Sequence, residues 1–127
     1  MERILESIHA SYAYERGFYG RGIGVAVLDT GIFPHQDLQN KTIYFKDYIK
    51  GRRMPYDDNG HGTHISGIIG AKNDTGRHGV APECSLLGFK VLDRGGNGLI
   101  EDTCRAVEHV IRMNRETPGA VRIINVS

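Results

Sequence analysis

The sequence predicts an α/β fold in which helices cover both faces of a mostly parallel sheet. Two nearly continuous apolar runs, at residues 23–28 and 121–126, are typical of strands that are buried on both faces. Between them, apolar residues recur every three or four positions, which is typical of helices. This alternation of strand and helix predicts a doubly wound domain of three layers.

The first third of the chain predicts one short helix and two strands. Residues 4–12 place Ile4, Leu5, Ile8 and Tyr12 on one helical stripe. The buried strand at residues 23–28 follows, and Asp29 ends its apolar run. Residues 42–49 predict a second strand with less regular alternation, and a polar loop leads on to Asn59.

A glycine-rich helix is predicted from His61 to Ala71. Its isoleucines fall at helical spacing, and Asp58 or Asn59 could cap its first turn. Each glycine inside a helix costs about 1 kcal/mol relative to alanine. We therefore expect close packing to stabilise this helix.

The remaining elements continue the alternation. Residues 84–92 predict another strand, and residues 93–98 form a glycine-rich loop. A helix follows, with Pro118 and Gly119 at its end. Its predicted buried stripe consists of Ile100, Cys104, Val107 and Ile111, and its predicted ion pairs are Glu101–Arg105 and Glu108–Arg112.

Composition excludes several classes of partner. Sixteen basic and fifteen acidic residues nearly cancel, and no basic run marks a surface for nucleic acid or anionic lipid. No apolar stretch is long enough to span a membrane, and residues 1–6 carry charges where a secretory signal is apolar. Cys84 and Cys104 lack metal-binding spacing, which favours buried, reduced thiols over a disulfide. These features predict a cytoplasmic location.

Asp29 and His61 are the residues best placed for chemistry. Ligands of open α/β sheets bind beyond the carboxyl ends of the strands, where Asp29 lies. A carboxylate there needs hydrogen-bond donors, and His61 at a predicted helix start is a candidate. The positive end of a helix favours a neutral imidazole, which a general base requires. The carboxylate would hold one tautomer and direct the other ring nitrogen towards a serine hydroxyl.

Six blocks in order resemble the subtilisin-like serine proteases, the subtilase family. The resemblance extends from about Ile8 to the last residue. Its blocks are Val25–Gly31, His35–Leu38, His61–Gly67, Gly79–Pro82, Lys90–Leu92 and Ile124–Ser127. It implies a subtilisin-like three-layer αβα fold and a serine-type endopeptidase that acts through an Asp-His-Ser triad and an acyl-enzyme.

The resemblance also implies roles for individual residues. Asp29 resembles the triad aspartate, His61 the triad histidine, and His64 a second histidine with a structural role. Gly96, Asn97 and Gly98 resemble one rim of the substrate cleft, and Ser127 begins the opposite rim. Between such rims the family binds an extended polypeptide by strand-like pairing.

The resemblance further implies a calcium-binding loop, although the chemistry requires no cofactor. Asp37, Asn73 and the carbonyls near Thr75 and Arg77 would supply oxygen ligands. The family's ligand from an N-terminal side chain has no clear counterpart, and Arg77 adds unfavourable charge. Both a calcium-bound and a calcium-free loop therefore remain open.

The nucleophile-bearing half of the domain has no counterpart in residues 1–127. Neither an oxyanion-hole asparagine nor a Gly-Thr-Ser-like segment appears before Ser127. We therefore interpret the chain as the N-terminal part of a peptidase domain, inactive alone. An incomplete sheet exposes an apolar edge, so we also expect self-association, which light scattering measures.

Two other classes of function stay open. His61, His64 and Asp29 could give zinc three ligands, but the spacing differs from H-E-x-x-H and its glutamate is missing. The glycines at residues 20–24 precede a strand instead of following it, which argues against a nucleotide loop. A non-catalytic binding or folding module derived from a truncated protease is the remaining alternative.

Overall fold

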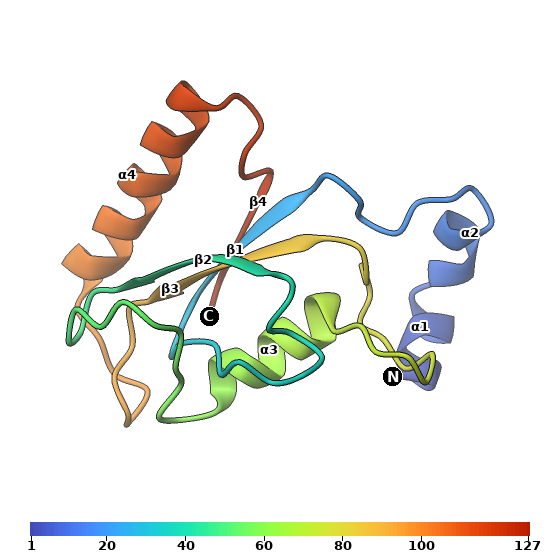
Figure 1. The fold of residues 1–127 in the computed structure, drawn as a ribbon, viewed down its shortest axis with the longest axis horizontal. Helices are drawn as coiled ribbons and strands as arrows, with labels where there is room; N and C mark the ends of the chain where they lie inside the picture. Colours follow the sequence, from blue (N-terminus) through green and yellow to red (C-terminus); the bar gives the residue numbers. More distant parts are fainter.

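The computed structural model describes residues 1–127 and contains one parallel sheet of four strands (Figure 1). The strands lie in the order β2-β3-β1-β4. Their bounds are β1 Gly24–Asp29, β2 Thr42–Asp47, β3 Ser85–Lys90 and β4 Ile123–Val126. Helix α3 (His61–Gly70) packs on one face and α4 (Ile100–Glu116) on the other. The predicted α/β architecture with a parallel sheet is confirmed.

Strand β1 contributes side chains to two hydrophobic cores, one on each face of the sheet. All six of its residues are buried, and successive side chains point to opposite faces. Val25 and Val27 pack in the cluster that α3 covers, and Ala26 and Leu28 pack in the cluster that α4 covers. The carboxyl end of β1 is thereby fixed from both faces.

Helix α4 packs mainly through a stripe next to the predicted one, of which only the partly buried Val107 contacts the core. Its buried residues are Asp102, Ala106 and Val110, whereas Ile100 is 79% exposed and Cys104 is also exposed. The helix carries two adjacent apolar stripes, and the small Ala106 lets it approach the sheet closely. Cys84 is buried as predicted, and both thiols are free.

The predicted ion pairs of α4 do not form. In their place Arg105 donates to Asp102 Oδ1 at 3.3 Å, because Asp102 lies one helical turn before Arg105.

Strand β4 is more exposed than predicted. It lies at the edge of the sheet with β1 as its only partner, and Ile123 is 53% and Val126 59% exposed. Of this segment only Val121, which precedes the strand, belongs to the core. The continuous apolar pattern therefore did not distinguish an edge strand from a central one.

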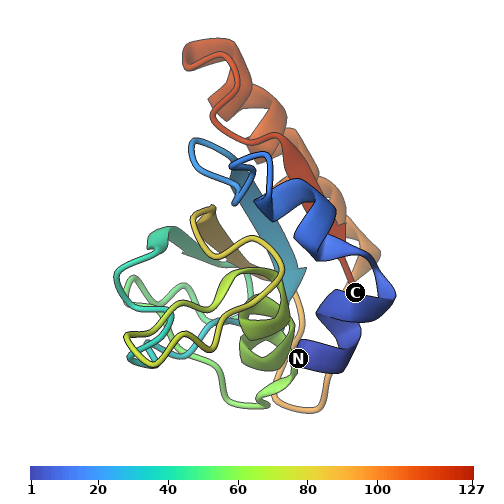
Figure 2. The same ribbon diagram turned by 90° about the vertical axis from the view of Figure 1, so that its right-hand side faces the viewer.

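The N-terminal segment forms two short helices in place of the single predicted one. Figure 2 shows α1 (Glu2–Ser7) and α2 (Ala10–Tyr14) outside the sheet. His9, with a φ of 56°, breaks the helix between them. Ile8 is 53% exposed, so the predicted stripe covers no core. None of the helices combines the length and apolar character needed to cross a bilayer.

Candidate active site

Asp29 ends β1 with its side chain completely buried. The backbone N–H of Thr30 donates to its Oδ1 at 2.7 Å. Its own backbone carbonyl accepts from the N–H groups of Val91 and Leu92, at 3.0 and 3.2 Å. A buried carboxylate is tolerated only where donors surround it. The turn after β1 and the residues after β3 together hold Asp29 in place.

His61 is the first residue of α3 and lies against Asp29. Its Nδ1 is 2.9 Å from Oδ1 and 3.0 Å from Oδ2 of that carboxylate. The side chain of His61 is 53% exposed, and its Nε2 makes no hydrogen bond. With the proton held on Nδ1, Nε2 is available as a proton acceptor. The pair therefore combines a buried carboxylate with an accessible base.

Asp57 organises the turn that delivers His61. Its Oδ1 accepts from Thr30 Oγ1 and from the N–H groups of Asn59 and Gly60, at 2.9 to 3.0 Å. Its Oδ2 accepts from both the N–H and the hydroxyl of Thr63, at 3.0 and 2.6 Å. Burial raises the pKa of Asp57, but the bonds from Thr63, Gly60 and Asn59 outweigh it and lower the pKa to about 2.

The start of α3 touches the end of β1 directly. The backbone N–H of Gly62 donates to Thr30 Oγ1 at 2.9 Å. A Cβ atom at Gly62 would lie 2.2 Å from the carbonyl oxygen of Gly31 and 3.2 Å from the Cβ of Asp29. Only glycine permits this approach. The close packing predicted for the glycine-rich helix is thus found at its first turn.

Sequence reasoning missed Thr30 and Asp57 and misplaced the helix cap. The residue before α3 is Gly60, with a φ of 107°, and Asn59 Oδ1 accepts the N–H of His61 at 3.1 Å. Asn59 therefore assists the turn from one position further out. An aspartate four residues before a helix-start histidine, with a threonine inside the first turn, was the available signal for the role of Asp57.

Replacing Asp57 with asparagine should make the free energy of unfolding depend less on pH in the acid range. The carboxylate has a depressed pKa in the folded state, so its stabilisation is fully present above about pH 4 and is lost as pH falls towards 2. We expect a loss of at most about 2.5 kcal/mol in the free energy of unfolding at neutral pH, and less because solvent screens this half-exposed group. Urea titrations from pH 2 to 7 measure it. The control is Asp74→Asn, at an exposed carboxylate; an equal effect there would contradict the role of Asp57.

The residues predicted to form the cleft rims flank β1. The loop containing Gly96–Gly98 follows β3, and Ser127 follows β4, the two neighbours of β1. Asn59 Nδ2 donates to the carbonyl of Arg94 at 2.9 Å, which ties the first rim to the turn before His61. Ser127 N–H donates to the carbonyl of Leu28 at 3.4 Å. All four predicted rim residues are exposed, and their binding of substrate stays a prediction.

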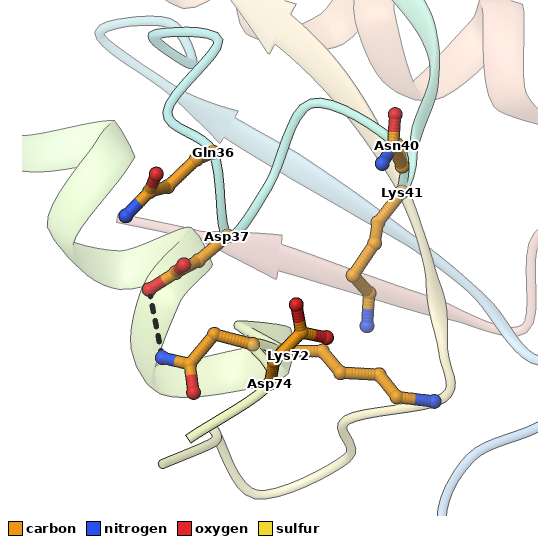
Figure 3. Close-up of a pocket in the computed structure, with 7 residues that line it drawn as sticks. Gln36, Asp37, Asn40, Lys41, Lys72 and Asp74 are labelled. Atoms are coloured by element: carbon orange, nitrogen blue, oxygen red, sulfur yellow. Dashed lines mark hydrogen bonds between the residues drawn. The ribbon is translucent and has the colours of Figure 1, made fainter. Parts of the chain in front are cut away.

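Two of the predicted calcium ligands, Asp37 and Asn73, line a polar pocket, shown in Figure 3, whereas Thr75 and Arg77 are not among its lining residues. Asn73 Nδ2 donates to Asp37 Oδ2 at 3.2 Å, while Asn73 Oδ1 accepts from the N–H and hydroxyl of Thr75, at 3.0 and 2.6 Å. Lys41 and Lys72 line the same pocket. In this arrangement Asn73 turns its amide NH₂ towards Asp37 and its amide oxygen towards Thr75, so its oxygen is already engaged within the loop. Calcium binding stays a prediction.

The alternative zinc site is not assembled. His64 is exposed, and no group of three or more His, Cys, Asp or Glu side chains is close enough to hold a metal ion. His61 instead directs Nδ1 to Asp29 alone.

A known family matches most of the chain. The profile of the Subtilase family covers residues 20–127. The chain belongs to the subtilase family. The resemblance seen in the six blocks is thereby confirmed, and the matched residues of this subtilase chain include both Asp29 and His61.

Several curated proteases are similar to this subtilase chain. Serine protease AprX of Bacillus subtilis (strain 168) is 41% identical over 123 residues, 93% of this chain and 28% of that protein. Subtilisin BL of Lederbergia lenta is 40% identical over 123 residues, 91% of this chain and 45% of that protein. Minor extracellular protease Epr of Bacillus subtilis (strain 168) is 41% identical over 105 residues, 82% of this chain and 16% of that protein. The subtilase chain thus spans less than half of each relative.

Proposed function

We propose that this chain supplies the acid and the base of a serine endopeptidase. His61 is the general base and then the general acid, and Asp29 is the carboxylate that orients it. The contact of Nδ1 with both oxygens of a fully buried Asp29 carries the proposal. The family supports it, since relatives such as AprX are named serine proteases.

The geometry suits one sequence of proton transfers. Nε2 of His61 takes the proton of a serine hydroxyl as the serine oxygen attacks the peptide carbonyl, while the other proton stays on Nδ1 and is donated to the Asp29 carboxylate. The imidazolium then gives the proton from Nε2 to the leaving amine, and an acyl-enzyme forms. Water, deprotonated by the same nitrogen, releases the acid product. The substrate is an extended polypeptide laid between Gly96–Gly98 and Ser127.

The serine nucleophile comes from outside residues 1–127. None of the serines in the chain makes a hydrogen bond to His61, and Ser66, on the same helix, is buried. We therefore expect no acyl-enzyme from residues 1–127 alone.

A fluorophosphonate probe tests this function. Residues 1–127 alone should remain unlabelled, and the product of the uninterrupted reading frame that contains them should be labelled in a way that depends on His61. Labelling of residues 1–127 that disappears in Asp29→Ala and His61→Ala variants would disprove the predicted inactivity. An unlabelled product that contains a Gly-Thr-Ser-like segment would disprove the protease assignment.

Two further predictions stay open beside this proposal. The cytoplasmic location has no support from the relatives, one of which is named an extracellular protease. Self-association stays a prediction that rests on the exposed β4 edge, with Ile123 and Val126 both more than half exposed.

A further inference from the structure

Lys90 is a completely buried lysine beside the candidate active site. It is the last residue of β3, paired in register with Asp29, and none of its side chain is exposed. Lysine is almost never fully buried unless it is paired. The proposed chemistry gives this ammonium group no part, so its position calls for another explanation.

All three donors of the ammonium group are used. Nζ donates to the carbonyl of Thr30 at 2.6 Å, to the carbonyl of Leu92 at 2.8 Å and to Asp58 Oδ1 at 2.8 Å. The ring of Tyr56 lies 5.2 Å from Nζ, close enough for a cation–π contact. The Lys90 side chain therefore joins the turn after β1, the residues after β3 and the turn before α3, through two backbone carbonyls and the Asp58 carboxylate.

Each of these segments bears on the Asp29–His61 pair. Thr30 follows Asp29 and donates its N–H to that carboxylate. Leu92 begins the connection to the Gly96–Gly98 rim and donates its own N–H to the Asp29 carbonyl. Asp58 lies three residues before His61, and the hydrogen bond from Lys90 lowers the pKa of its carboxyl. Lys90 therefore connects the turn that follows Asp29 to the turn that precedes His61.

We propose that Lys90 is a positioning residue that keeps His61 in register with Asp29 by binding Thr30, Leu92 and Asp58 together. An effect of Lys90 on catalysis depends on the function proposed above, whereas its effect on the position of His61 does not. An apolar side chain of the same length could fill the space, but it would leave two carbonyls and a carboxylate without their donor. Lys90 therefore acts on the chemistry through His61, without contact to the reacting atoms.

The test is the tautomer of His61 in the Lys90→Met variant. Magic-angle-spinning NMR of ¹⁵N-histidine reads both ring nitrogens even in a self-associated protein, and His61→Gln identifies the signal. At about pH 9, where imidazoles are neutral, the unaltered chain should carry the proton predominantly on Nδ1, with a small, measurable fraction on Nε2. Lys90→Met should shift the ratio of the two tautomers by about tenfold towards Nε2–H, the scale of one lost charged hydrogen bond.

Two variants separate positioning from general stability. Lys41→Met is the matched control, because Lys41 is a partly buried lysine that donates to the carbonyl of Pro82, outside the candidate site. It should lower the melting temperature and leave His61 unchanged. Lys90→Arg, which keeps the charge and the donors, should retain the original tautomer.

The outcomes are distinct. A Lys90→Met variant with a lower melting temperature and an unchanged tautomer would overturn the positioning role and leave the proposed protease function intact. A shifted tautomer supports the role even if Asp29 and His61 prove irrelevant to proteolysis. Should Lys90→Met fail to fold, Asp58→Ala decides, because it removes only the anchor before His61. An unchanged His61 tautomer in that variant would equally overturn the inference.

Discussion

Replacing His61 with alanine should lower kcat by about 10⁶-fold in a protease that combines this chain with a nucleophilic serine, the scale of the corresponding change in subtilisin. The reason is that Nε2 is the proposed proton acceptor for the serine, and His61 is the only side chain that forms a hydrogen bond with the Asp29 carboxylate. KM should change little, since the ring binds the transferred proton and not the substrate side chains. Steady-state kinetics on a chromogenic peptide measure both constants.

His64→Ala is the matched control for this prediction. It removes an exposed imidazole from the same helix, three residues further on. We expect kcat to stay close to that of the unaltered enzyme. A similar loss in both variants would point to damage to α3, and an active His61→Ala variant would refute the general-base role.

Replacing Asp29 with asparagine should lower kcat by about 10⁴-fold while the fold persists. The asparagine side chain matches the carboxylate in shape, and its oxygen can still accept the N–H of Thr30. Its NH₂ group would then face Nδ1 of His61, and Nδ1 would have to accept a hydrogen bond from it. The imidazole proton would therefore lie on Nε2, which could no longer accept the proton of the serine. The buried position of Asp29 keeps it from the substrate, so KM should change little.

The measurement for Asp29→Asn combines kinetics with the ¹⁵N signal of His61. The kinetic loss should accompany a shift of the proton to Nε2. Asp74→Asn, at an exposed carboxylate, should change neither quantity. A full kinetic loss with the proton still on Nδ1 would contradict the tautomer mechanism.

Sequence patterns predicted the central elements because local chemistry determines them. The run before Asp29 is apolar on both faces, which is typical of a strand buried on both faces, and all six residues of β1 are buried. The stripe of α4 could not be predicted, since its two adjacent apolar rows are equivalent until the sheet selects Ala106 and Val110. The exposure of β4 depends on its place at the edge, which the sequence of the strand does not encode.

The proximity of Asp29 and His61 followed from a rule about sheet edges, whereas their supporting residues did not. Carboxyl ends of parallel strands meet at one edge, so an acid after a strand and a base at a helix start can be placed together. Asp57 and Lys90 act through the conformation of a turn and through backbone carbonyls. Such partners cannot be predicted from the sequence, because they depend on the three-dimensional conformation of the loop.

The bonds around the Asp29–His61 pair have a consequence for the order of assembly. Every hydrogen bond described for Asp29, His61, Asp57 and Lys90 comes from residues 29–92. During synthesis the ribosome therefore makes every hydrogen-bonding partner of the pair before α4 and β4, whereas the packing of Ala26 and Leu28 on the α4 face of β1 is completed only afterwards. The hydrogen bonds of the pair are thus local in sequence, while the burial that surrounds Asp29 depends on elements translated later.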